Sequence, residues 1–325
     1  MSQPPTIRDV AAEAGVSPAL VSIVFREVPG ASPANRRRVL EAAERIGYKP
    51  NAIASRLRSR ARRSLGVFMF DLRNDLTSDV FQGIQGRADQ EGIDLVVGVS
   101  DPSGERDERT IGELIAARVD AIALISTAMK GAELRQLDRT VPLVSVTRRV
   151  NGIDSVVADD AAGSAAVVGH IASLGIERVV YLAPPWDHNA RLEGYRAAME
   201  RLGLEPEVVQ VEYGAEAAFG AARRLIRSGR LPRAIFAYND LMAHAVLEAL
   251  VESGLVAPQD VAVAGFDNVR FSASKLISLT SVDQRAGALG ALAVDRALSR
   301  LGSRRGPAGL SVIEPELVIR RSTAG

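Results

Sequence analysis

The sequence of 325 residues contains no cysteine, which excludes disulfide bonds and thiolate metal ligands. Its three histidines, His170, His188 and His244, are far apart and lack the spacing of a zinc-binding motif. No apolar run reaches the roughly 18 residues of a membrane-spanning helix, and the start, MSQPPTIRDV, has neither the basic nor the apolar region of a signal peptide. We therefore expect a cytoplasmic protein with no metal site and no other cofactor.

Sequence motifs of catalysis are missing as well. The chain has no GxSxG nucleophile elbow, no P-loop and no GxGxxG dinucleotide-binding motif. The paired acids Asp159 and Asp160 are adjacent, an arrangement most often found at the start of a helix. The sequence thus predicts no catalytic residue and no enzyme.

Basic residues are concentrated at one end of the chain. Residues 1–63 carry 12 lysines and arginines against five acids, a net charge of +7, whereas the other 262 residues carry a net charge of −6. A small basic segment on a mildly acidic body is typical of a nucleic-acid-binding module joined to a second domain. A basic tail on an enzyme is the alternative that charge alone leaves open.

Three short helices are predicted within residues 1–47. Gly15 allows a sharp turn after the first helix, and Gly47 ends the third. Each start carries an N-capping residue, followed in two cases by a proline: Thr6 with Asp9, Ser17 with Pro18, and Ser32 with Pro33. The pattern predicts a helix-turn-helix, in which the second helix enters the major groove of DNA.

The second helix has an unusual outward face. On a helical wheel, the side that can pack on the other helices holds Leu20, Val21, Val24 and Phe25. The opposite side holds Pro18, Ala19, Ser22, Ile23 and Arg26. Small and apolar groups on that side can contact thymine methyls in the major groove, so we expect groove contact. The alternative is that Ile23 packs against the third helix.

The segments TIRDVAAEAGVS and RRRVLEAAERIGYKPNAIASRL resemble the head of the LacI/GalR family of bacterial transcriptional repressors, nearly continuously over residues 6–58. In that family the start of the second helix and a following arginine usually contact bases. Here Pro18 and Ala19 take the first positions, Leu20 replaces a usual threonine, and Ile23 replaces the arginine. No family operator sequence can be carried over, so we expect recognition to depend on thymine methyls, DNA shape and the hinge.

Residues 48–63, YKPNAIASRLRSRARR, form the predicted hinge helix and linker. A helix of about eight residues is marginal in water, so this segment would gain order on a partner, and its arginines attract phosphates. In the family, the leucine at the position of Leu57 resembles a minor-groove wedge, with Ala54 beside it. A flexible linker is the alternative. The wedge implies a homodimer on a roughly palindromic DNA operator.

The complete set of predicted DNA-binding residues extends from the first helix into the hinge. Its members are Thr6, Ser17, Pro18, Ala19, Ser22, Ile23, Arg26, Ser32, Asn35, Tyr48, Asn51, Ala54, Leu57 and Arg58.

From Ser64 onward, short apolar runs alternate with amphipathic helices such as 107–119 and 240–254. This alternation predicts an α/β body with parallel sheets and helices on both faces. The predicted strands are 65–70, 95–99, 121–126, 143–146, 178–183, 234–238 and 261–266.

Polar residues just after the predicted strands are the candidates for a ligand site, because ligands of such sheets bind at the carboxyl ends of the strands. They are Asp71, Thr147, Arg148, Asp159, Asp160, Asn239, Asp240, Asp267 and Asn268. Carboxylates, amides and an arginine suit a polyhydroxylated molecule, and Trp186 can stack on the apolar face of a sugar. Each of these residues can instead cap the next helix, which we expect for Asp160 and Asp240.

Residues 64–325 also resemble the effector domain of the LacI/GalR family, itself similar to periplasmic sugar-binding proteins, through RLEGYRAAM, AIFAYNDLMAHAVLEAL, DVAVAGFDN and PELVIRRSTAG. The resemblance implies two lobes. One comprises about 64–160 and 285–313, and the other comprises about 161–284 and 314–325. The chain would cross between the lobes near Asp160, Gln284 and Glu314. Arg191, Asn239 and Asp267 fall where the family holds ligand hydroxyls or carboxylates. Asp75, Leu76 and Thr77 stand where it often has proline and aromatics, and Thr147 where an aspartate is common.

These observations predict a small all-α helix-turn-helix head on a two-lobed, periplasmic-binding-protein-like α/β core. The function they indicate is a homodimeric, sequence-specific transcriptional regulator, a repressor, controlled by a sugar or sugar derivative bound between the lobes. The alternatives are a cytoplasmic sugar-binding protein and an α/β enzyme with a basic DNA-binding head. The predicted effector contacts are Asp71, Leu76, Thr77, Thr147, Arg148, Trp186, Arg191, Asn239 and Asp267.

Overall fold

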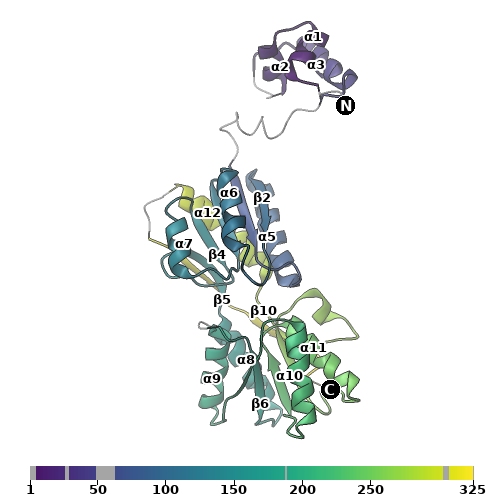
Figure 1. The fold of residues 1–325 in the computed structure, drawn as a ribbon, viewed down its shortest axis with the longest axis vertical. Helices are drawn as coiled ribbons and strands as arrows, with labels where there is room; N and C mark the ends of the chain where they lie inside the picture. Colours follow the sequence, from purple (N-terminus) through teal and green to yellow (C-terminus); the bar gives the residue numbers. More distant parts are fainter. Residues whose placement is uncertain (1–4, 26–28, 49–62, 187–188, 303–306, 325) are drawn as a thin grey trace. The chain divides into compact units, whose positions relative to one another are not determined.

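The structure is a computed structural model that describes residues 5–25, 29–48, 63–186, 189–302 and 307–324. Contacts divide the chain into two units, residues 1–63 and 64–325, called here the head and the body (Figure 1). In the described part of the chain, no helix combines the length and apolar character that a membrane crossing requires.

The head consists of three helices, α1 (Ile7–Ala14), α2 (Pro18–Phe25) and α3 (Pro33–Arg45). The predicted caps are confirmed: the Asp9 carboxylate accepts from the Thr6 N–H and hydroxyl, both at 2.7 Å. The hydroxyl oxygens of Ser17 and Ser32 accept the backbone N–H of the third residue after each. Gly15 ends α1 with a φ of 61°, a left-handed conformation that glycine adopts without strain.

The head has its own apolar core, in which Val10, Val21 and Val39 contribute one fully buried valine from each helix. An ion pair of 3.0 Å between Arg45 and Glu13 also links α3 to α1. Amphipathic spacing in α1 and α3, together with the apolar helix α2, therefore produces a compact helix-turn-helix unit.

The first lobe of the body, called the N-lobe, has a six-stranded sheet in the order β11-β5-β4-β3-β1-β2, with every strand pair parallel. Its helices α5 and α12 share one hydrophobic cluster with the sheet, and α6 and α7 share another. The strands are β1 (Ser64–Met69), β2 (Asp94–Val99), β3 (Ala121–Ile125), β4 (Leu143–Val146), β5 (Asp154–Ala158) and β11 (Leu310–Ile313). The helices are α5 (Asp75–Glu91), α6 (Asp107–Ala116), α7 (Gly131–Leu137) and α12 (Ala286–Gly302).

The second lobe, the C-lobe, has a sheet in the order β12-β10-β9-β8-β6-β7, in which β12 alone runs antiparallel to its neighbour. Helices α8 and α9 contribute to one cluster and α10 and α11 to another. The strands are β6 (Val179–Ala183), β7 (Glu207–Gln210), β8 (Ala234–Ala237), β9 (Ala262–Asp267), β10 (Thr280–Asp283) and β12 (Glu316–Val318). The helices are α8 (Asp160–Ser173), α9 (Ala190–Arg201), α10 (Ala215–Arg227), α11 (Asp240–Glu252) and the short 3-10 helix η1 (Arg270–Ala273).

The chain passes between the two lobes at three places. They are the segments between β5 and α8, between β10 and α12, and between β11 and β12. Gln284 lies in the second segment and Glu314 in the third. A body built from three such passages brings residues far apart in the sequence to the junction of the lobes.

Several strands had not been expected from the sequence. β7 and β11 are sheet edges with half-exposed residues, and they lack the continuous apolar run of a buried strand. In β10, Thr280 and Ser281 are fully buried but polar. Their hydroxyls find partners within the C-lobe, so hydrogen bonds replace apolar packing in that strand.

Candidate nucleic-acid interface and interlobe site

The described DNA-binding candidates of the head fall into two groups. Thr6, Ser17 and Ser32 are helix caps, with Asn35 N–H donating to Ser32. On α2, Pro18 and Ala19 are exposed, whereas Ser22 and Ile23 are half-buried. Ile23 lies near Gly30, in the segment before α3, because a Cβ atom built on Gly30 would be 3.7 Å from Ile23 Cγ2. Groove contact of Ile23 and its packing on α3 both stay predictions.

The remaining candidates, apart from Arg26, follow α3 in the sequence. The ring centres of Tyr48 and Phe25 are 5.5 Å apart. This contact holds the segment after α3 against the end of α2. Five predicted DNA contacts lie outside the described residues: Arg26, Asn51, Ala54, Leu57 and Arg58.

In the body, Arg191 lies at the centre of a buried network. Its Nη1 is 3.2 Å from Asp267 Oδ1 and donates to the Tyr238 carbonyl at 2.8 Å, and its Nε is 3.4 Å from Asp160 Oδ1. The guanidinium carbon lies 4.0 Å from the centre of the Phe266 ring and 4.6 Å from that of Tyr238. One cation therefore balances the buried carboxylate of Asp267 and the half-buried carboxylate of Asp160, between two aromatic rings.

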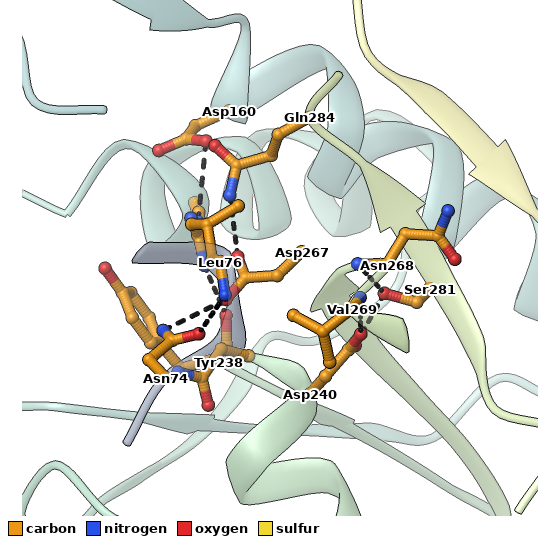
Figure 2. Close-up of polar contacts among 12 residues, drawn as sticks. Asn74, Leu76, Asp160, Tyr238, Asp240, Asp267, Asn268, Val269, Ser281 and Gln284 are labelled. Atoms are coloured by element: carbon orange, nitrogen blue, oxygen red, sulfur yellow. Dashed lines mark hydrogen bonds and ion pairs between the residues drawn. The ribbon is translucent and has the colours of Figure 1, made fainter. Parts of the chain in front are cut away.

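Asp267 connects the two lobes, as Figure 2 shows. Its Oδ1 accepts from Gln284 Nε2 at 2.6 Å, and its Oδ2 accepts from Asn74 Nδ2 at 3.4 Å. Asn74 precedes α5 of the N-lobe, and its Oδ1 accepts from Leu76 N–H as the N-cap of that helix. Burial raises the pKa of Asp267 to about 6, while the charge of Arg191 opposes the rise.

An aromatic cluster adjoins this network. Trp186 stacks on Tyr213 with ring centres 5.4 Å apart and meets Tyr238 edge-on at 5.1 Å. The Tyr213 hydroxyl accepts from Asn74 Nδ2 at 3.4 Å, which is a second contact across the lobes. Burial raises the pKa of Tyr213 to about 12, so its phenol stays protonated at neutral pH.

We call the residues Asn74, Asp160, Arg191, Tyr213, Tyr238, Asp267 and Gln284 the interlobe site. A cavity of about 560 Å³ lies beside it and shares Asp267 with it. Residues of α5, the end of β9 and the start of α12 line this cavity, so both lobes contribute to it. Its volume is in the range of small-molecule sites.

Buried polar atoms without a hydrogen bond gather in this part of the body. Among the described residues there are eight such atoms, and six belong to residues in or next to the interlobe site. Those six are Asp160 Oδ1, Tyr181 OH, Asn189 Nδ2, Arg191 Nε, Asn239 Nδ2 and Gln284 Oε1. Asp160 Oδ1 and Arg191 Nε face each other in the 3.4 Å ion pair, so four atoms remain without a polar partner. Because buried polar groups are normally paired, the concentration of these four indicates a place where a polar ligand supplies the missing partners.

The expectation that Asp160 and Asp240 cap the following helices is wrong. Their neighbours do so, since Asp159 Oδ1 accepts from Ala162 N–H and Asn239 Oδ1 from Met242 N–H. Asp160 instead pairs with Arg191. Asp240 accepts from the N–H of Val269 and the hydroxyls of Ser272 and Ser281, and so anchors the chain after β9 (Figure 2).

The predicted N-lobe contacts are held mainly by their own lobe. Asp71 is buried and accepts from the backbone N–H and the guanidinium of Arg73. Arg148 donates to the carbonyls of Thr127 and Met129, and burial lowers its pKa. Leu76 and Thr77 are buried, and Thr147 is half-buried with a φ of 68°. The structure thus brings together Trp186, Arg191, Asn239 and Asp267 more closely than the N-lobe candidates.

Five residues of the interlobe site were absent from the predicted effector contacts although the structure places them there, and one of them, Asp160, had been predicted to cap a helix. Tyr238 directly follows β8, so the strand-end rule could have included it. The sequence indicated Gln284 only as a place where the chain crosses between the lobes. For Asn74 the sequence carries only the signal of a helix N-cap. Tyr213 follows the short edge strand β7, which the sequence did not indicate.

Comparisons with known proteins show the family to which the chain is related. Residues 6–51 match the model for bacterial regulatory proteins of the lacI family, and residues 168–323 match the periplasmic binding protein-like domain. The catabolite control protein A of Priestia megaterium is 30% identical over 299 residues, which cover 89% of this chain and 90% of that protein. The chain belongs to the lacI family of bacterial regulatory proteins.

Other members of the lacI family agree with this placement. The ribose operon repressor of Escherichia coli K12 is 30% identical over 306 residues, covering 91% of this chain and 93% of that protein. The crystal structure of the lac repressor dimer bound to operator and the anti-inducer ONPF aligns with a TM-score of 0.86 and 27% identity, covering 99% of this chain and all of that one. The predicted fold, a helix-turn-helix head with a periplasmic-binding-protein-like core, is confirmed, and the chain is a DNA-binding transcriptional regulator.

Proposed function

We propose that this lacI-family regulator is a homodimeric repressor whose affinity for a roughly palindromic operator is set by a polyhydroxylated effector, a sugar or sugar derivative, at the interlobe site. The observation that carries the proposal is the concentration of unpaired buried polar atoms where the two lobes meet. A head that can bind DNA and a body that can bind a small molecule together make a ligand-controlled regulator.

The chemistry of the unpaired atoms favours hydroxyl groups. Asn189 and Asn239 offer amide donors, whereas Gln284 offers an acceptor. A hydroxyl both donates and accepts, so a ring with several hydroxyls can satisfy neighbouring atoms of both kinds. Trp186 and Tyr213 add aromatic faces on which the apolar side of a sugar ring can stack.

Contacts between the lobes explain how such an effector would act. Asn74 of the N-lobe already bonds Asp267 and Tyr213 of the C-lobe, so a ligand bound to these groups changes the preferred lobe arrangement. A change in the body would alter DNA affinity through the hinge, with a coupling of about 1–3 kcal/mol, or about 5–150-fold. Whether the effector releases or promotes DNA binding depends on the arrangement it prefers.

Similarity to the named relatives supports repression, dimerisation and a sugar-like effector. One relative is a repressor of a ribose operon, and the aligned lac repressor is a dimer on its operator. We extend these properties to this chain, together with a cytoplasmic location and the absence of catalysis. Incubating the protein with the sugars that it binds, and finding product, would instead favour the enzyme alternative.

Fluorescence anisotropy on DNA from upstream of the protein's own gene tests the proposal. We expect tight binding that survives unrelated competitor DNA and shifts with one member of a sugar panel. Trp186 is the only tryptophan, so its emission reports independently on binding at the interlobe site. Binding that competitor abolishes, with only the steep salt dependence of phosphate contacts, would contradict specific operator recognition.

A further inference from the structure

Helix α2 has few side chains that can hydrogen-bond the edge of a base. Its sequence, PALVSIVF, contains no charged and no amide side chain, the groups that make bidentate contacts with guanine and adenine. Ser22 is the single polar side chain within it. The hydroxyl oxygen of Ser17, which precedes the helix, is engaged as its cap. Bidentate recognition of base pairs is therefore unavailable to this helix.

Two arginines of α3 do not supply what α2 lacks. Arg36 Nη1 lies 3.5 Å from the carbonyl oxygen of Val24, near the end of α2. Arg38 Nη2 donates to the carbonyl of Ala14 at 2.8 Å, at the end of α1. Both guanidiniums thus occupy helix C-termini, where they stabilise exposed carbonyls and the helix dipoles.

What α2 offers outward is mainly apolar. Pro18 and Ala19 are exposed, and half-buried Ile23 lies near Gly30. A Cβ atom placed on Gly30 would lie 3.7 Å from Ile23 Cγ2 and 3.8 Å from its Cδ1, so an added methyl group at Gly30 would just touch the Ile23 side chain. The β-branched isoleucine has few χ1 rotamers, so its methyl groups keep a defined direction on the helix.

We propose that α2 recognises the C5 methyl groups of pyrimidines in the major groove, mainly through Ile23 and Ala19. At the contacted positions it accepts 5-methylcytosine in place of thymine, because it detects the methyl group and not the hydrogen-bonding pattern of the base. This inference rests on the proposed function as an operator-binding protein. It names the chemical feature of the operator that the head selects.

The test uses the full-length protein and an operator selected from random DNA. Each thymine is replaced singly by uracil, which removes only the methyl group and leaves the protein unchanged. We expect at least one thymine per half-site at which uracil lowers affinity about fourfold, the effect of losing one buried methyl group. Changing both half-sites should lower affinity about 15-fold, since the two losses multiply.

A second series separates the methyl group from the base. Replacing the sensitive T·A pair by C·G should lower affinity, and methylating that cytosine at C5 should recover most of the loss. In the Ile23→Ala protein, with its helix content checked by circular dichroism, thymine and uracil should bind nearly equally at the Ile23 position. The conservative Ile23→Val protein, which keeps a branched side chain, should retain a preference for thymine.

Two results would overturn the inference. One is an operator in which uracil replaces every thymine without loss while other base changes reduce binding. The other is a sensitive T·A pair at which 5-methylcytosine binds no better than cytosine. A selection that enriches no sequence would be a different failure, because it would overturn specific operator binding itself and this inference with it.

Discussion

Arg191 is both a candidate ligand contact and a structural cation. It is 5% exposed and faces Asp160 and Asp267, with Phe266 and Tyr238 on its faces. Burial by itself lowers the pKa of Arg191, but the charges of Asp160 and Asp267, with the two neighbouring tyrosines, outweigh that effect. The family resemblance indicated only the ligand contact, because the partners of Arg191 come from three separate segments of the chain.

Arg191→Ala should therefore lower the free energy of unfolding of the body by about 3–5 kcal/mol, since the buried carboxylate of Asp267 and the half-buried one of Asp160 lose their counter-charge. Adding Asp267→Asn to Arg191→Ala should recover part of this loss by removing one uncompensated charge. Urea unfolding followed by the emission of Trp186 measures both values in the body. A double variant as unstable as the sum of the two single variants would contradict the charge argument.

Asp240 should make stability depend on pH. Burial and the nearby Asp267 raise its pKa from 3.8 to about 7 in the folded protein. Between these values the folded state holds a proton that the unfolded state has released, so the free energy of unfolding falls as pH rises from about 4 to about 7. Asp240→Asn should flatten this fall, leaving the part due to Asp267, whose pKa is about 6.

Thermal unfolding at several pH values between 4.5 and 8 measures this dependence. Asparagine keeps one acceptor for the donors at Ser272 and Ser281, so the variant is expected to fold with a lower midpoint. Wild-type protein in the same buffers is the reference. If the stability of the Asp240→Asn protein fell as steeply with pH as that of the wild type up to pH 7, the carboxyl group of Asp240 would not be the source of the pH dependence.

At the scale of elements, α5 and α12 pack through glycines. A Cβ atom added to Gly83 would overlap the backbone of Gly287, and one added to Gly290 would overlap the carbonyl of Val80. Such close approach fixes the two helices on the N-lobe sheet. It also gives a matched pair of positions, because Gly86 on the same helix has nothing within 4 Å of an added Cβ.

Gly83→Ala should destabilise the body by about 1–3 kcal/mol, the usual effect of overpacking. Gly86→Ala should stabilise it by about 0.5–1 kcal/mol, because alanine loses less backbone entropy in a helix. Thermal unfolding of both variants provides the comparison. Equal shifts of the same sign would show that helix propensity, and not the close contact, decides the result.

Asn74 combines two tasks at the start of α5, and substitution can separate them. Serine keeps the N-cap but is too short to reach Tyr213 and Asp267, whereas alanine loses the cap as well. Both variants should open the lobes, seen as a larger radius of gyration in small-angle scattering. Only Asn74→Ala should also lose about 0.5–2 kcal/mol of stability. Unchanged scattering from Asn74→Ser would show that these contacts do not hold the lobes together.

Prediction from sequence succeeded for elements with a strong local signal. The head helices carry caps, and central strands such as β3 are fully buried and therefore apolar throughout. Edge strands such as β7, and the polar strand β10, contain no continuous apolar run that would indicate a strand. Likewise, strand ends indicated Asn239 and Asp267, but Asn74 and Tyr213 reach the same site from loops, and only tertiary folding brings them there.

At the scale of the whole molecule, a palindromic operator requires two heads, and the C-lobe carries a surface suited to self-association. Val251, Val256 and Leu276 are 74%, 56% and 95% exposed. They line a groove of about 800 Å³ with further apolar residues, and Glu248, Glu252 and Arg321 also contribute to it. An apolar centre with charges of both signs is self-complementary under a twofold axis, as a homodimer requires.

Leu276→Asp should therefore convert the dimer into a monomer in analytical ultracentrifugation. Operator affinity should fall with it, because a single head gains only half of the contacts with the palindrome. Leu174→Asp is the matched control, since Leu174 is also an exposed leucine of the C-lobe, at 44%, but lies outside this groove. The control should keep both the dimer and its operator affinity. A Leu276→Asp protein that still sediments at twice the mass of the chain would place the dimer contact on another face of the body.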